Sequence, residues 1–310
     1  MSAKNRTIAT EFILLGFSTD LQTNILLFVL FLVNYIVTIS GNCLIVWLFL
    51  VNPQLYIPMY FFLCILSFLD LCTSTSVVPR ILVDLFSSRR TISLAACTVQ
   101  FYTVLFMSGT ESLLLALMAY DRYVAICRPL HYPLMMRWRT CYCLTALMWI
   151  VSFMVFIIPA LSMPTDLCYP NQINHFMCEA ISVLQLACED VTLNEVVMLF
   201  TCFVALFFPF AFIIVSYSSI ISSVLKIHSK GRSKAFSTCT SHITVVVLAY
   251  GTAMIMYFSP SAQYSASYGK YLSLFSLTIA PTVNPLIYTL NNKDVKESMR
   301  KVFLKSTIDK

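Results

Sequence analysis

Long, mostly apolar stretches recur along the chain, and short segments rich in charge or proline separate them. A helix needs about 20 consecutive apolar residues to cross the hydrocarbon core of a bilayer. We therefore expect each stretch to form a membrane-spanning helix. The seven predicted spans are 24–50, 58–83, 94–127, 140–161, 195–225, 235–260 and 270–290.

These spans predict an all-α membrane protein, a seven-transmembrane helix bundle over residues 24–290. Residues 1–23 form a predicted N-terminal segment and residues 291–310 a tail. In the tail, apolar residues fall on one face of a helix, which predicts a short amphipathic helix on the membrane surface. These tail residues are Val295, Met299, Val302 and Phe303.

The basic residues predict the orientation. The loops after the third and fifth spans and the tail carry 13 Lys and Arg residues, whereas the opposite side carries 6. Positive residues concentrate on the cytoplasmic side, so we expect a multi-pass plasma-membrane protein with an extracellular N-terminus and a cytoplasmic C-terminus. The sequon Asn5-Arg6-Thr7 lies on the predicted outer side, which makes Asn5 a predicted glycosylation site.

Composition agrees with insertion in a membrane. The chain is 59% hydrophobic and 11% charged, and its mean hydropathy is +0.81. A soluble domain of this length needs more charge to cover its surface. The net charge of +6 does not indicate a nucleic-acid partner, because the basic residues follow the topology.

Four of the 12 cysteines fall at the predicted outer face, where disulfides persist. They are Cys97, Cys168, Cys178 and Cys188. Four cysteines allow three pairings, and their spacing does not choose among them.

Two acids lie in the middle of predicted spans, Asp70 and Glu111. Buried ionisable groups are costly in a membrane and indicate a functional site. Either each acid is protonated and hydrogen-bonded, or the two share a sodium ion, with Asn42 or Asn284 as further oxygen donors. We expect no other cofactor. Asn284-Pro285 also predicts a bend in the seventh span.

Other classes of function fit less well. An enzyme needs a cluster of catalytic or metal-binding groups, but the four His residues are scattered over loops and helix ends. A channel or transporter needs polar groups repeated along a pore, whereas the two intramembrane acids sit at one depth. A receptor remains the preferred interpretation.

Five motifs occur in order along the chain, and together they resemble the olfactory receptors within the rhodopsin-like G-protein-coupled receptors. The motifs are Met118–Cys127 (MAYDRYVAIC), Pro58–Leu63 (PMYFFL), Lys234–His242 (KAFSTCTSH), Ser216-Tyr217, and Pro281 with Asn284–Tyr288 (NPLIY). Five positions depart from the family pattern: Tyr56, Met177, Glu179, Ala249 and Asn291.

The resemblance implies a mechanism. It implies disulfides Cys97–Cys178 and Cys168–Cys188, and it supports an ion at Asp70 and Glu111. It also implies coupling to a heterotrimeric G protein of the stimulatory type, which raises cAMP. The coupling and switch residues would be Asp121, Arg122, Tyr123, Tyr217, His242, Asn284, Pro285 and Tyr288.

Counting helical turns from these motifs places a predicted ligand site in the outer half of the bundle. Its predicted lining is mostly apolar, which suits a small, neutral, volatile odorant. At Val104, receptors for amines have an acid, so a charged amine would depend on Asp166, Glu179 or Glu189 of the outer loop. The alternative is a rhodopsin-like receptor for a non-odorant ligand. The predicted lining residues are Val104, Leu105, Ser108, Met198, Thr201, Cys202, Ala205, Tyr250, Met254, Tyr257, Leu274 and Leu277.

Overall fold

The computed structural model describes residues 9–17, 20–162, 166–226, 229–258, 262–291 and 295–301. Within these ranges, the side chains of 229–238, 257–258, 262–267 and 290–291 lie outside the description. The predicted glycosylation site Asn5 and the tail residues Val302 and Phe303 also fall outside it.

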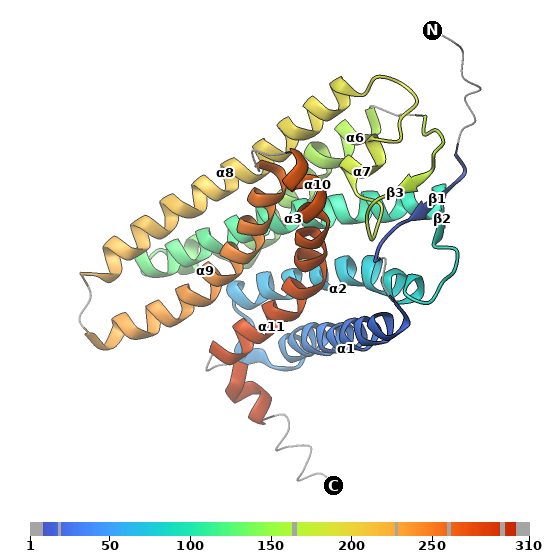
Figure 1. Cartoon of the computed structure of the whole chain (residues 1–310). Helices are drawn as coiled ribbons and strands as arrows, with labels where there is room; N and C mark the ends of the chain where they lie inside the picture. The colour runs from blue at the N-terminus through green and yellow to red at the C-terminus, as the bar shows by residue number, and fades with distance from the viewer. Residues whose placement is uncertain are drawn as a thin grey trace.

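Seven helical segments pack side by side, as the hydropathy pattern predicts (Figure 1). Six of them are long and apolar enough to cross a membrane. Among the described residues the seventh segment is not in that set, and the sequence of its first helix carries Gln263, Lys270 and several Ser and Tyr residues. The segments are α1 (Leu21–Val51), α2 (Pro58–Asp84), α3 (Leu94–Cys127), α5–η2–α6 (Trp138–Ser152, Phe153–Ile157, Ile158–Ser162), α8 (Thr192–Val224), α9 (Ser229–Phe258) and α10–η3–α11 (Ala262–Leu274, Phe275–Ile279, Ala280–Asn291).

The helix ends explain where the predicted boundaries hold. Asp20 caps α1, since its side chain accepts hydrogen bonds from the backbone N–H groups of Gln22 and Thr23. Pro58 occupies the first turn of α2, where its missing N–H costs nothing. The helices of the first span and of the last three spans begin several residues before the predicted starts, because they continue into polar sequence that hydropathy does not mark.

Two segments contain a π-helical turn, η2 and η3. A π turn holds one more residue than an α turn and rotates the faces of the helix beyond it. Pro285 lies inside α11, and an added Cβ at Gly41 of α1 would lie 3.1 Å from its ring. Gly41 therefore allows α1 and α11 to approach closely.

Short elements complete the fold. η1 (Pro53–Leu55) and α4 (Tyr132–Met135) lie in loops. The tail is helical over 295–301, and the buried side chain of Val295 packs on the core, as the predicted amphipathic pattern requires. Lys301 contacts Glu297 at 3.2 Å and Gln54 at 3.1 Å.

A three-stranded sheet lies at one end of the bundle, in the order β2-β1-β3 (Figure 1). β1 (Glu11–Leu14) pairs antiparallel with β2 (Thr91–Ser93) and parallel with β3 (Gln172–Ile173). The hydropathy pattern did not predict these strands, because they are too short to show a period of two.

Candidate ligand-binding site

The end of the bundle that carries the sheet also carries two disulfides, Cys97–Cys178 and Cys168–Cys188. This is the pairing that the family resemblance implies. We call this end the disulfide end. Cys97 lies in the first turn of the long helix α3, so the first bridge fixes the loop after α6 directly above the bundle.

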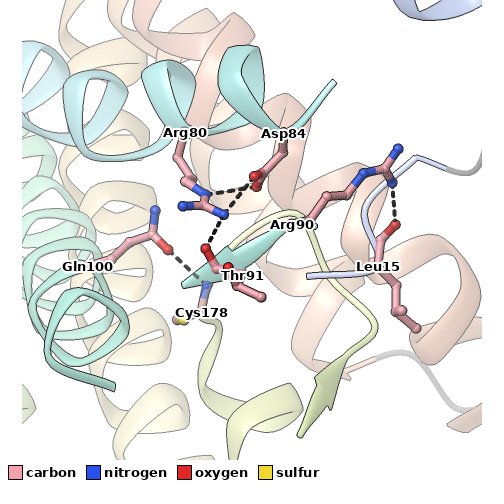
Figure 2. A network of polar contacts seen from close by, with 7 residues as sticks. All are labelled: Leu15, Arg80, Asp84, Arg90, Thr91, Gln100 and Cys178. Carbon is pink, nitrogen blue, oxygen red and sulfur yellow. Dashed lines mark hydrogen bonds and ion pairs between the residues drawn. The ribbon is translucent and has the colours of Figure 1, made fainter. Parts of the chain in front are cut away.

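Polar contacts hold that loop to the helices (Figure 2). Gln100 of α3 donates to the Ser76 carbonyl at 2.8 Å and accepts from the Cys178 N–H at 2.9 Å. On α2, Arg80 pairs with Asp84 at 2.6 Å and donates to the Thr91 carbonyl of β2 at 2.8 Å.

The N-terminal segment lies across the same loop. Arg90 donates to the carbonyls of Leu15 and Phe17, and Figure 2 shows the first of these bonds. The ring of Phe17 packs 4.2 Å from that of Phe176. Gly16, which lies between Leu15 and Phe17, adopts a φ of 53°, a conformation that favours glycine. The segment is therefore tied to the loop by backbone and aromatic contacts.

His175 in this loop is buried, and its Nδ1 atom lies 3.3 Å from the Met177 N–H. Burial, with a smaller effect of the Lys270 charge, lowers the pKa of His175 from 6.5 to about 4. An unfolded chain therefore binds a proton at this residue between those values and the folded chain does not.

We expect thermal stability to fall as the pH falls from 6.5 to about 4. His175→Asn keeps an acceptor but does not titrate, so its melting temperature in lipid nanodiscs should fall less over that range. Parallel curves for the two proteins would contradict this assignment.

Beneath the loop lies a cavity of about 160 Å³, the central cavity. Met177, Cys178 and Glu179 of the loop form its roof, and Glu111 and Tyr250 border it deeper in the bundle. Most of the remaining wall is apolar, with a few hydroxyls. Of the predicted lining residues, seven border it: Val104, Leu105, Ser108, Cys202, Ala205, Tyr250 and Leu277.

A second cavity of about 260 Å³, the lateral cavity, lies between α3, α6, α8 and the short loop helix α7 (Ala180–Leu184). Met198 and Thr201 border this cavity and not the central one. The predicted lining is thus divided between two cavities, which share Leu105 and Cys202.

Two of the predicted residues lie elsewhere. Met254 packs against the main core and Leu274 against a cluster around Phe31, and neither borders the two cavities. A step of one helical turn can be taken as three or as four residues, so counting turns along a helix does not identify the residue that faces the cavity. On α9, Ala253 and Met256 border the central cavity instead of Met254. The side chain of Tyr257 lies outside the described residues.

Phe156 of η2 borders both cavities, as do Phe101, Leu105, Ala180 and Cys202. Its ring rests on Gly109 of α3, where an added Cβ would lie 2.2 Å from the ring. Neither residue stands out in the sequence, because a glycine that faces a ring on another helix leaves no local pattern.

Gly109→Ala should therefore displace the Phe156 ring. Overpacking of this kind costs about 1–3 kcal/mol, so we expect a lower melting temperature and weaker ligand binding. Gly251→Ala is the matched control, because nothing lies within 4 Å of an added Cβ there. Equal melting temperatures for the two variants would refute the contact.

At the floor of the central cavity, Tyr250 of α9 connects three helices. Its hydroxyl donates to the Ser112 carbonyl of α3 at 2.8 Å. The Ser112 hydroxyl donates to the Ala205 carbonyl of α8 at 3.0 Å and lies 2.8 Å from the Tyr250 hydroxyl. A molecule in the cavity thus touches a residue that links α3, α8 and α9.

Asp70 lies beside Asn284, whose side-chain amide donates to both carboxylate oxygens at 3.1 and 3.2 Å. Asn284 Oδ1 and Tyr288 Oη are buried and have no hydrogen-bond partner among the described residues. These orphaned oxygens suit a cation or water. No cluster of three or more His, Cys, Asp or Glu in the described ranges could hold a metal ion, so a cation there would rely on Asp70, Glu111 and neutral oxygens.

The opposite end of the bundle, which we call the basic end, contains the other predicted switch residues. Asp121 is buried and accepts a hydrogen bond from Tyr132 at 2.9 Å. The Tyr217 hydroxyl lies 2.8 Å from His242 Nδ1, and the two rings are stacked. The charge of the half-buried Arg122 acts on both. Tyr123 is half-buried against the core.

The comparisons with known proteins are consistent with this arrangement. The sequence profile described as "Olfactory receptor" matches residues 31–306. The chain is 45% identical to Olfactory receptor 2B6 of Mus musculus, over 100% of both chains. It is also 45% identical to Olfactory receptor 2B2 of Homo sapiens, over 100% of this chain and 87% of that protein. A crystal structure of squid rhodopsin has the same fold, with a TM-score of 0.73 at 17% identity, over 95% of this chain and 91% of that one.

Proposed function

Because the chain belongs to the olfactory receptor family of G-protein-coupled receptors, we propose that it binds a small, neutral, mostly apolar and volatile odorant in the central cavity and activates a stimulatory G protein that raises cAMP. The observation that carries this proposal is Tyr250, which borders the cavity and is hydrogen-bonded to α3.

The size and lining of the cavity support the ligand class. Pockets for drug-sized ligands are roughly 300–1,000 Å³, whereas the central cavity is about 160 Å³. Its hydroxyls, among them those of Ser108, Thr252 and Ser276, offer isolated hydrogen bonds within an apolar wall. A small molecule with one polar group suits such a cavity.

We propose that the disulfide end faces the outside of the cell and that the basic end faces the cytoplasm. The excess of Lys and Arg at the basic end supports this orientation. The disulfides support it as well, because they persist in an oxidising compartment. In this orientation Asn5 remains a predicted glycosylation site and the tail remains cytoplasmic.

Activation is a population shift between two packings of the helices. A ligand that presses on Tyr250 biases α9, and the end of α9 near His242 moves away from Tyr217. The resulting groove, bordered by Arg122 and Tyr288, receives a helix of the G protein. Leu130, in the loop before α4, is 92% exposed and supplies an apolar contact for that partner.

A cell assay tests the proposal. Cells that express the chain and a cAMP reporter are exposed to a diverse odorant panel, with cells lacking the receptor as control. We expect a concentration-dependent cAMP response to small neutral odorants. A response to non-volatile peptides alone, or ligand-driven signalling without cAMP, would contradict it.

We also propose that Asp70 and Glu111 bind a sodium ion that stabilises the inactive packing. The orphaned oxygen of Asn284 beside Asp70 supports such a site. Sodium chloride should then raise the melting temperature more than choline chloride does, and Asp70→Asn should remove the difference. Equal effects of the two salts on the unaltered protein would indicate protonated acids instead.

A further inference from the structure

The roof of the central cavity contains a carboxylate, that of Glu179. This residue follows Cys178, which the disulfide fixes to α3. Glu179 also caps the loop helix α7: its Oε2 atom accepts hydrogen bonds from the Ser182 N–H at 3.1 Å and from the Ser182 hydroxyl at 3.2 Å. Its position is therefore fixed by a covalent bridge on one side and a helix cap on the other.

The carboxylate faces the cavity rather than a basic partner. Its charge acts on the Cys202 thiol of α8, which borders the same cavity. The ion pairs within the described ranges are Arg80–Asp84 and Lys301–Glu297, and neither involves Glu179. Burial raises the pKa of Glu179, and the hydrogen bonds from Ser182 oppose that effect.

Glu179 is half-buried, and a carboxylate that is partly removed from water without a basic partner is costly unless a hydrogen-bond donor reaches it. Helix α7 supplies donors through Ser182 and the backbone N–H of Ile181, and the carboxylate also borders the central cavity, where a ligand can donate to it. We infer that Glu179 accepts a hydrogen bond from a hydroxyl group of the ligand, so that the receptor selects alcohols over ethers, ketones and esters of the same shape. This inference rests on the proposed binding of a small neutral odorant.

The chemistry of the acceptor determines this selectivity. An ionised carboxylate only accepts hydrogen bonds, and an ether or carbonyl oxygen also only accepts. Such an oxygen next to Glu179 loses its bond to water and gains none in return. A hydroxyl instead forms a charge-assisted bond, which is stronger than a neutral one.

Binding of three molecules of equal heavy-atom count tests the inference without any G protein. Hexanol, hexylamine and methyl pentyl ether are titrated against the purified full-length receptor in lipid nanodiscs, with thermal stabilisation as the readout. The measurement is repeated with Glu179→Gln. Ser182→Ala is the matched control, because it removes the hydroxyl that donates to Glu179 but keeps the backbone N–H donor and the carboxylate.

We expect hexanol to bind the unaltered receptor about tenfold more tightly than the ether, because one hydrogen bond to a charged group contributes a free energy of that size. Glu179→Gln should reduce that preference severalfold. Ser182→Ala should lower the melting temperature of the receptor with every ligand but should keep the preference for hexanol. If hexylamine binds more tightly than hexanol and loses that advantage in Glu179→Gln, Glu179 is still the acceptor, but the neutral-ligand part of the proposed function fails.

An equal preference in the unaltered receptor and Glu179→Gln would overturn the inference, and so would an ether that binds as tightly as hexanol. Failure of all three molecules to bind would overturn it as well. A normal preference without any cAMP response would instead contradict the proposed signalling.

Discussion

Arg122→Ala should abolish the ligand-driven cAMP response while the receptor still reaches the cell surface. Arg122 lies near the end of α3, and its charge acts on Tyr217, His242 and Tyr288 from α8, α9 and α11. It is half-buried, so its removal leaves no large cavity in the core. The expected loss is therefore in coupling and not in folding.

The measurement is the maximal cAMP response divided by surface expression. Arg122→Lys keeps the charge but not the planar guanidinium, and we expect an intermediate response. Arg139→Ala is the matched control, because this exposed arginine begins α5 at the same end of the bundle. Normal ligand-driven cAMP from Arg122→Ala would refute the role assigned to Arg122.

Cys178→Ser should prevent correct folding at physiological temperature. The bridge from Cys97 to Cys178 spans 81 residues, and loss of a native disulfide typically costs about 2–5 kcal/mol. Loss of the bridge should disturb the roof of the central cavity most, because Cys178 is 1% exposed and adjoins both Met177 and Glu179 there. We expect surface delivery and ligand binding to be lost together.

Surface labelling of intact cells measures this effect. Cys97→Ser should match Cys178→Ser, and the double variant should be no worse than either, since all three remove one bond. Cys143→Ser is the control, because Cys143 is an exposed free cysteine on α5. Normal surface expression of Cys178→Ser, or additive losses in the double variant, would contradict a structural role for the bridge.

The sequence determined the number of helical segments and most of their boundaries. A span in a membrane must be long and apolar, so a property of consecutive residues is sufficient to find it. The predicted coupling residues around Arg122 and the pair Asn284-Pro285 lie in motifs that a family carries at fixed spacing. They were identifiable before their contacts were known.

Which residues line a cavity depends on helix rotation, and only the tertiary structure decided that. The π turns η2 and η3 rotate the faces beyond them, and a turn of 3.6 residues does not choose between three and four. Met198 and Thr201 of α8 border a second cavity, and Met254 and Leu274 border neither, because the rotation of each helix about its own axis decides which of its residues face a cavity. The contact of Gly109 with Phe156 and the place of Glu179 in the roof join residues far apart in sequence. The free energy of such contacts depends on distances between helices, and no pattern within one helix records them.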